Sequence, residues 1–558
     1  MNKLEIILKH VIFKKYLKSQ ISGKLFLKKN PNEIKKISIT YKKLFDIEYD
    51  FDEKLLSNYI FLNKSNALIV LKNKLKNIFF TNNNRVSYCF LNQFYSTFAR
   101  KKYFTKFFLP MCDEQIKFIK TNTDIKLSIW KCKLFFLILT LRHLSMGFIF
   151  GLTSLLLSLI HIAFKKKKNF TSRHIFFDLE MNEEDIENIK NGHDFFIVKK
   201  FLKKFKVSKN IIINIKPKNK KINFYKKKID YNGYSFYFKN NPYPNIENIS
   251  NLFKYFFWLN LSFLICLKDL LFFKKWYNSF LFLEAVKSKL FHYSEKSQIP
   301  YIFIVPYNGS INRSLWTLDF KKNIKRSYMF FYSTNGDGCK TKFYNPNNVS
   351  NWWGELDYEN YLVWDKYQAK SLKKNLKVKN PKVITIGPML SSCSEKNDMT
   401  NFSKKFIVIF DVVPERFSYD FFISYSIIKP KHLINFQNDI LKIASELNVD
   451  VLHKIKRRRS DTTVSKTYVK NILKLKKFNN YKQINENQSV ETLVKKSKGV
   501  ISFPYTSTSL IAKYMKIPTV YYDSSKCLID IEERIQSHGV KIINNYEELR
   551  VWMKNVIK

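Results

Sequence analysis

Short apolar runs of strand length alternate with amphipathic stretches through the carboxyl-terminal part of the chain. We expect strands at 406–410, 449–453, 499–503 and 519–522, and helices at 436–447, 489–496 and 507–515. Strands that alternate with helices form a parallel sheet covered by helices. Residues 405–545 are therefore predicted to form one doubly wound, Rossmann-like domain, followed by a terminal helix within 546–558.

The same alternation begins earlier, near residue 170. Strands are expected at 174–179, 211–215, 301–305, 328–332 and 383–386, and helices at 280–291 and 365–376. Residues 169–390 are predicted to form a first Rossmann-like domain, and the polar stretch 391–404 is predicted to be an interdomain linker. The expected fold class is α/β, with two Rossmann-like domains and an additional amino-terminal region, 1–133, in which we find no motif.

One segment, 134–168, is predicted to be membrane-associated. Residues 144–164 carry no formal charge and would form a helix of about 31 Å, close to the thickness of a bilayer core. A membrane anchor, spanning or re-entrant, and a buried helix in a large core both fit this pattern. A second apolar stretch, 255–273, is interrupted by Lys268 and Asp269, which suits a membrane interface or a packed amphipathic helix.

The chain is strongly basic, with 98 Lys+Arg against 45 Asp+Glu and a formal net charge of +53. Lys, Asn, Ile, Phe and Tyr are abundant while Gly and Pro are scarce, as AT-rich codons would produce. We find no helix-turn-helix, zinc-finger or RNP-like motif, so no nucleic-acid partner is expected. A basic chain usually has an acidic partner, such as nucleic acid, anionic lipid or a phosphorylated substrate, but codon composition accounts for much of this charge. The acidic partner that we expect is the anionic surface of the inner membrane.

The cysteines and histidines indicate neither a disulfide framework nor a metal site. The seven cysteines are scattered without a CxxC pair, and the nine histidines include no HExxH. This distribution is typical of a reducing cytoplasm. We expect no metal and no cofactor.

Four consecutive hydroxyl residues follow the strand at 499–503. After Pro504 and Tyr505, the run Thr506, Ser507, Thr508 and Ser509 opens the next expected helix. The free N–H groups and positive dipole end of a helix start form an anion site. One cap residue would satisfy the helix, so four hydroxyls favour a nucleotide-phosphate site over simple capping.

The strand at 449–453 ends in a basic run. The candidates for binding the nucleotide phosphate there are His453, Lys454, Lys456 and Arg457. Cations at a strand end can hold a phosphate leaving group and stabilise its developing charge. A solvated basic loop is the alternative. We expect the carboxyl ends of the strands at 449–453 and 499–503 to lie side by side, so that both loops reach one phosphate.

Other polar residues follow neighbouring strands. Glu415, Asp337 and His453 are candidates for the catalytic base that deprotonates an acceptor hydroxyl, although Glu415 and Asp337 also suit a turn. Acceptor-side contacts are expected from Asn308, Gly309, Arg313 and Asn335. Trp364 lies in an apolar run, which favours core packing over stacking on a sugar.

The order of these features resembles that of GT-B glycosyltransferases, and especially of bacterial transferases of sialic-acid and capsule type. The resemblance covers about residues 300–545 and rests on these features: Trp364-Asp365 after a strand, Gly387-Pro388 after another, a linker, a His-bearing strand end and a Ser/Thr loop. In such enzymes a His-Pro pair and a Ser/Thr cluster hold the nucleotide. His453 and Thr506 to Thr508 match these in order, but Lys454 stands where the family has proline.

The resemblance implies a metal-independent transfer of sugar from a nucleotide-sugar donor to a glycan or lipid-linked acceptor. The reaction would serve surface polysaccharide such as capsule or lipopolysaccharide, at the cytoplasmic face of the inner membrane. A non-catalytic polysaccharide-assembly protein with the same fold is the alternative. A membrane-bound nucleic-acid protein is a third hypothesis, favoured by charge alone.

Overall fold

The structure is a computed structural model that describes part of the chain. The described residues are mainly 129–164, 174–181, 212–217, 228–238, 243–307, 314–334, 356–388, 405–414, 428–454, 464–484 and 488–558, with short gaps inside some of these ranges. Residues 1–128 and the expected linker, 391–404, lie outside them.

The carboxyl-terminal domain contains a six-stranded parallel sheet. Its strands are β9 (Phe406–Phe410), β10 (Asp450–Lys454), β11 (Tyr481–Ile484), β12 (Gly499–Ser502), β13 (Thr519–Tyr522) and β14 (Lys541–Ile543). They lie in the order β11-β10-β9-β12-β13-β14, and each neighbouring pair is parallel. Counted from β9, this is the 3-2-1-4-5-6 order of a Rossmann fold. The predicted doubly wound domain is confirmed.

Helices cover both faces of this sheet. They are α13 (Pro430–Glu446), α14 (Lys466–Leu475), α15 (Val490–Lys496), α16 (Ser507–Tyr514) and α17 (Tyr546–Ile557). Side chains alternate along β9, so Ile407 and Ile409 pack with the cluster of α13, α14 and α17. Val408 faces the opposite side and packs with the cluster that includes Leu493 and Ala512 of α15 and α16. The sequence analysis did not identify α14, β11 and β14.

The preceding domain contains an eight-stranded sheet. Its strands are β1 (His174–Met181), β2 (Ile212–Pro217), β3 (Lys228–Tyr231), β4 (Tyr234–Phe238), β5 (Ile302–Tyr307), β6 (Arg326–Phe331), β7 (Asn360–Val363) and β8 (Lys382–Thr385). The order is β3-β4-β2-β1-β5-β6-β7-β8. The β3–β4 pair is antiparallel, and the other pairs are parallel. The second predicted Rossmann-like domain is thus confirmed, with an unpredicted edge hairpin.

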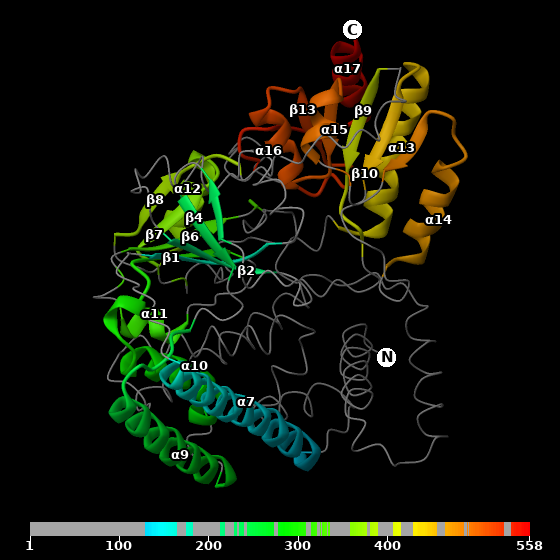
Figure 1. Ribbon diagram of the computed structural model, residues 1–558. Helices are drawn as coiled ribbons and strands as arrows, with labels where there is room; N and C mark the ends of the chain where they lie inside the picture. Colours follow the sequence, from blue (N-terminus) through cyan, green and yellow to red (C-terminus); the bar gives the residue numbers. More distant parts are fainter. Residues whose placement is uncertain are drawn as a thin grey trace.

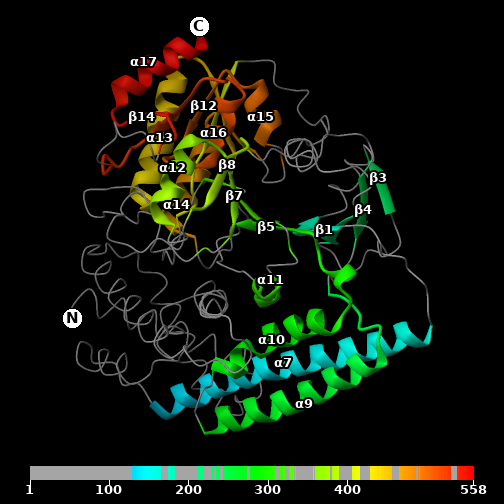
Figure 2. The same ribbon diagram turned by 90° about the vertical axis from the view of Figure 1, so that its left-hand side faces the viewer.

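Three long helices form a layer beneath this sheet, on the side away from the carboxyl-terminal domain (Figures 1 and 2). They are α7 (Ile129–Ala163), α9 (Ile249–Leu271) and α10 (Tyr277–Tyr293). The short helix α11 (Leu315–Asp319) lies between α10 and the sheet, and α12 (Lys366–Asn375) follows β7. A single apolar core joins α7, α9, α10 and α11 to the strands. The predicted helix at 144–164 is continuous and leaves an apolar surface uncovered, as expected.

Candidate functional site

The carboxyl ends of β9 and β12 meet at the switch point of the Rossmann order. The two strands are adjacent, and the Phe503 N–H donates to the Phe410 carbonyl at 2.8 Å. The chain leaves these strands in opposite directions around the sheet, which opens a crevice where open α/β sheets bind ligands. Asp411 follows β9 at this edge, and the start of α16 follows β12. The hydroxyl cluster therefore lies at the place where a ligand is expected.

The start of α16 is held by an unusual turn. Tyr505 adopts a φ of 62°, a left-handed conformation that is uncommon for a non-glycine residue. The next residue, Thr506, is the N-cap, but its hydroxyl donates to the Phe503 carbonyl at 3.1 Å and makes no capping bond to the helix. The Thr508 hydroxyl lies 3.1 Å from that of Ser502. Simple capping by the Thr506 side chain therefore does not describe this helix start.

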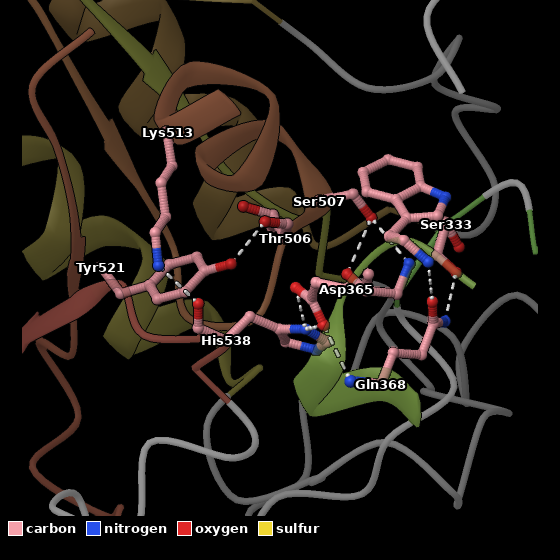
Figure 3. Close-up of polar contacts among 10 residues, drawn as sticks. Ser333, Asp365, Gln368, Thr506, Ser507, Lys513, Tyr521 and His538 are labelled. Carbon is pink, nitrogen blue, oxygen red and sulfur yellow. Dashed lines mark hydrogen bonds and ion pairs between the residues drawn. The ribbon is translucent and has the colours of Figure 1, made fainter. Parts of the chain in front are cut away.

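This helix start touches the first domain. The Thr334 N–H donates to Ser507 Oγ at 3.3 Å, and the two hydroxyl oxygens are 3.5 Å apart (Figure 3). Thr334 follows β6 in the loop from which acceptor-side contacts were predicted. The structure thus places the hydroxyl cluster of one domain against the predicted acceptor loop of the other.

A carboxylate–imidazole pair forms a second contact between the domains. His538 Nδ1 lies 2.8 Å from Asp365 Oδ2, and Asp365 Oδ1 also accepts the Gln368 N–H that begins α12 (Figure 3). Lys513 of α16 donates to the His538 carbonyl at 2.8 Å. Burial raises the pKa of Asp365, but the hydrogen bond and charge of His538 outweigh this effect and hold the pKa below its ordinary value. The carboxylate is therefore ionised at neutral pH.

Apolar side chains complete this interface. Trp364 packs with Leu510, Tyr521 and Val540 of the carboxyl-terminal domain, and its Nε1–H donates to the Phe331 carbonyl at 2.7 Å. Only 4% of Trp364 is exposed. The predicted core role of this tryptophan is confirmed, because its faces are covered by protein.

His453 lies in the interior and not on the crevice surface. It is 0% exposed, with Nδ1 2.7 Å from the Tyr481 hydroxyl and Nε2 3.0 Å from Asp411 Oδ1. The predicted direct roles of His453 in catalysis and nucleotide contact are therefore wrong for this arrangement, because a side chain enclosed by its partners reaches no substrate. Lys454, the last residue of β10, is also buried.

Asp411 is the centre of this buried network. Its Oδ2 accepts hydrogen bonds from the Tyr468 hydroxyl at 2.7 Å and from the Gln437 amide at 2.6 Å. Burial raises the pKa of Asp411, but the charge and hydrogen bond of His453 and the bonds from Tyr468 and Gln437 outweigh it, so the pKa lies below its ordinary value. The network fixes the ends of β9 and β10 beside the crevice.

The basic strand end and the hydroxyl loop are not neighbours, contrary to prediction. Both lie at the same edge of the parallel sheet, but β9 separates β10 from β12. Two strand steps amount to about 10 Å, so a ligand that touched both loops would extend across the end of β9. The predicted direct neighbourhood of 449–453 and 499–503 is wrong because strand order is decided by tertiary packing, which places β9 between them.

Several predicted site residues lie outside the described residues. They are Glu415, Asp337, Lys456, Arg457, Asn308, Gly309, Arg313 and Asn335. Asp365 and His538 were missed as an interdomain pair. Trp364-Asp365 had been noticed as a strand end, but no local pattern marks His538. Within the described part of the chain, no group of three or more His, Cys, Asp or Glu residues is arranged to hold a metal ion.

Comparison with known proteins gave one family and a set of distant folds. The family model described as polysaccharide biosynthesis PFTS motif protein matches residues 260–553. The UDP-GlcNAc 2-epimerase of Methanocaldococcus jannaschii, solved with UDP-GlcNAc and UDP, is 11% identical with a TM-score of 0.36, covering 69% of this chain and 93% of its own. The trehalose 6-phosphate synthase of Burkholderia multivorans is 7% identical with a TM-score of 0.37. The match covers 70% of this chain and 91% of the synthase. No curated protein matches.

Proposed function

Since this chain belongs to the polysaccharide biosynthesis PFTS motif family, we propose that it is a GT-B-type glycosyltransferase. It moves a sugar from a nucleotide-sugar donor to a glycan or lipid-linked acceptor of surface polysaccharide, such as capsule or lipopolysaccharide. In this reaction an acceptor oxygen bonds to the anomeric carbon. The bond from that carbon to the donor phosphate breaks, and the nucleotide leaves with the electron pair.

The observation that carries this proposal is the position of the α16 start. It lies at the switch point of a Rossmann sheet and touches Thr334 of the other domain. Read as amino acids, the letters PFTS in the family description correspond to Pro504-Tyr505-Thr506-Ser507, with tyrosine in place of phenylalanine. This correspondence supports the choice of the helix start as the candidate phosphate site.

The chemistry of this helix start suits a departing nucleotide. Backbone N–H groups and the positive dipole end favour an anion, and the Ser507 and Thr508 hydroxyls add donors. Such donors stabilise negative charge as it develops on the leaving phosphate. Lys456 and Arg457, which follow β10 in the sequence, are proposed to contact the same nucleotide across the end of β9.

The acceptor proton requires a base. Asp337 and Glu415 are proposed for this role, because they follow strands β6 and β9 whose ends face the crevice. Asp411 is proposed as a positioning residue, since its carboxylate is fully engaged with Tyr468, Gln437 and His453.

A non-catalytic polysaccharide-assembly protein is the second candidate. The interior position of His453 favours it, because the one histidine that the sequence suggested as a catalytic group is enclosed. Such a protein would bind a nucleotide or glycan without turnover.

The cytoplasmic face of the inner membrane is proposed as the place of reaction. The scattered cysteines suit a reducing compartment, and the apolar helices of the first domain suit contact with a membrane that carries a lipid-linked acceptor.

Two measurements test the proposed function. In calorimetric titrations of the full chain with UDP, CMP and GDP, we expect one nucleotide to bind with much higher affinity than the other two. Incubation with radiolabelled sugars on that nucleotide and a membrane extract as acceptor should then transfer label to glycan or lipid. Nucleotide binding without transfer or hydrolysis would favour the assembly role, and absence of binding to any of the nucleotides would overturn the nucleotide site.

A further inference from the structure

We propose that α7 and α9 lie side by side in the plane of a membrane surface, and that neither helix crosses the bilayer. This inference concerns the helical layer of the first domain and does not rest on the proposed catalytic function. It differs from a spanning anchor, for which both helices are long and apolar enough by length and composition.

The two helices expose one apolar face, which we name the apolar platform. Its residues are Met146, Ile149, Leu152, Leu156, Leu157, Leu159 and Ile160 of α7, and Ile249, Phe253, Phe256, Phe257, Leu261, Leu264 and Leu271 of α9. Phe257 is 68% exposed and Ile149 is 62% exposed. An uncovered apolar surface of this extent, continued over two packed helices, marks an interaction site.

Polar side chains on these helices bond within their own helix. The exposed Thr153 hydroxyl donates to the Ile149 carbonyl at 2.8 Å, and the Asn260 amide donates to the Phe256 carbonyl at 2.8 Å. These bonds leave neither side-chain donor unsatisfied if hydrocarbon surrounds the helices. The polar side chains of the two helices are therefore compatible with lipid as the surrounding medium.

The opposite faces of both helices are built into the domain. A Cβ on Gly147 would lie 2.7 Å from Phe282 of α10, and one on Gly151 would lie 2.6 Å from Leu259 of α9. The Ser158 hydroxyl accepts the Ile246 N–H at 2.9 Å. Close packing of this kind means that α7 cannot leave the domain without exposing its core.

The layer behind the platform is unsuited to hydrocarbon. On α10, Glu284 and Lys287 form an ion pair at 2.8 Å, and Glu284 also accepts the Leu315 N–H that begins α11. A spanning α7 would carry α10 and α11 toward the bilayer with it, because α10 packs along α7 and α11 packs on α10 (Figure 2). Charged groups at that depth are costly. A helix lying flat keeps them on the protein side.

Basic residues at the margins of the platform define the lipid that it fits. Arg142 is exposed on α7 just before the first platform residue, and Lys254 and Lys268 are exposed toward the two ends of α9. An amphipathic surface of apolar centre and basic margin binds anionic lipid headgroups while its apolar residues enter the acyl boundary.

Vesicle flotation tests the docking surface. The full chain should float with vesicles containing phosphatidylglycerol and less with phosphatidylcholine alone. The double variant Phe253→Gln/Phe257→Gln should lower the partition coefficient at least about tenfold. The matched variant Leu473→Gln/Phe478→Gln removes two exposed apolar side chains from the other domain and should leave flotation unchanged. Equal flotation of both folded variants, or none by the wild type, overturns the proposal.

Depth measurement separates an in-plane helix from a spanning one. A fluorescent amino acid at position 145, 152 or 159 lies on one exposed face of α7 at two-turn intervals. Quenching by lipids with shallow and deep nitroxides should report the same shallow depth at all three positions. A deep signal at 152 with shallow signals at 145 and 159 would identify a spanning helix and overturn the inference.

Discussion

His538 Nδ1 lies 2.8 Å from Oδ2 and 3.0 Å from Oδ1 of Asp365, and this contact joins the two Rossmann-like domains. His538 is 3% exposed and precedes β14 in the second domain, while Asp365 begins α12 in the first. The pair lies beside the contact of Ser507 with Thr334 (Figure 3). It therefore holds together the two sides of the candidate site.

The substitution Asp365→Asn tests this contact. The new amide retains a side-chain oxygen that caps α12, since asparagine is as good an N-cap as aspartate, but the charge that attracts His538 is lost. We expect the interdomain contact to weaken by about 1.5–3 kcal/mol. Small-angle scattering should show a wider distribution of domain separations. Arg550→Gln breaks an exposed pair with Glu446 inside one domain, and this control should leave scattering unchanged.

The Asp411 network predicts a pH dependence of stability. Its pKa in the folded protein is held below the ordinary 3.8, so the stabilisation is complete above pH 3.8 and is lost as the pH falls through the folded value. At pH 7, Asp411→Asn should lower the free energy of opening of β9 and β10 by about 3–5 kcal/mol, measured by amide hydrogen exchange. The difference from wild type should shrink below about pH 4. If the difference in opening free energy between wild type and Asp411→Asn stayed constant down to pH 3, this result would contradict an ionised Asp411.

Removal of the hydroxyls at the start of α16 is expected to lower the affinity for the nucleotide. Ser507→Ala/Thr508→Ala should weaken binding by about 1–3 kcal/mol, as for hydrogen bonds to a charged group. Folding should change less, because Thr506 and Ser509 remain. Titration calorimetry with the preferred nucleotide measures the effect. Asn545→Ala removes the cap of α17, so it should lower stability by about 1 kcal/mol and leave affinity unchanged. If wild type and double variant bound the nucleotide with equal affinity, the two hydroxyls would have only a structural role.

The close packing of α7 on α10 can be tested by substitution of Gly147. A Cβ there would lie 2.9 Å from the backbone nitrogen of Leu283, which cannot rotate away. Gly147→Ala should cost about 1–3 kcal/mol by overpacking, offset by up to about 1 kcal/mol of helix propensity. Gly151→Ala meets the mobile end of Leu259 and should remain near wild type. Thermal unfolding in detergent compares the two; equal midpoints would mean that α7 and α10 separate easily.

Much of the fold could be predicted from sequence because it depends on local patterns. The run 406–410 is apolar throughout since β9 is buried on both faces, and the hydroxyl cluster precedes α16 because a helix start needs such residues. The short strand β11 was missed because only its two ends, Tyr481 and Ile484, are apolar. Helix α14 was overlooked although Tyr468, Ile472 and Leu475 are buried and repeat at helical spacing. The edge hairpin of β3 and β4 was overlooked although Asn232-Gly233, a strong hairpin turn signal, stands between the two strands in the sequence.

The candidate site could be predicted only in part. The start of α16 was placed correctly at the carboxyl edge of a parallel sheet, and Trp364 was assigned to the core. His453 was misplaced because a strand sends successive side chains to opposite faces, and sequence does not say which residue past the apolar run first reaches solvent. Nothing near His538 in the chain marks it, since its partner Asp365 lies in the other domain.

The sequence by itself determined two α/β domains, an apolar helix at 144–164 and a hydroxyl-rich helix start after β12, because these follow from the period of apolar residues and from the needs of helix ends. Tertiary structure alone decided that β9 lies between β10 and β12, that His453 is enclosed by Asp411 and Tyr481, and that His538 meets Asp365. The physical reason is that strand order and such pairings join residues far apart in the chain. Their free energies depend on packing and burial that no local pattern contains.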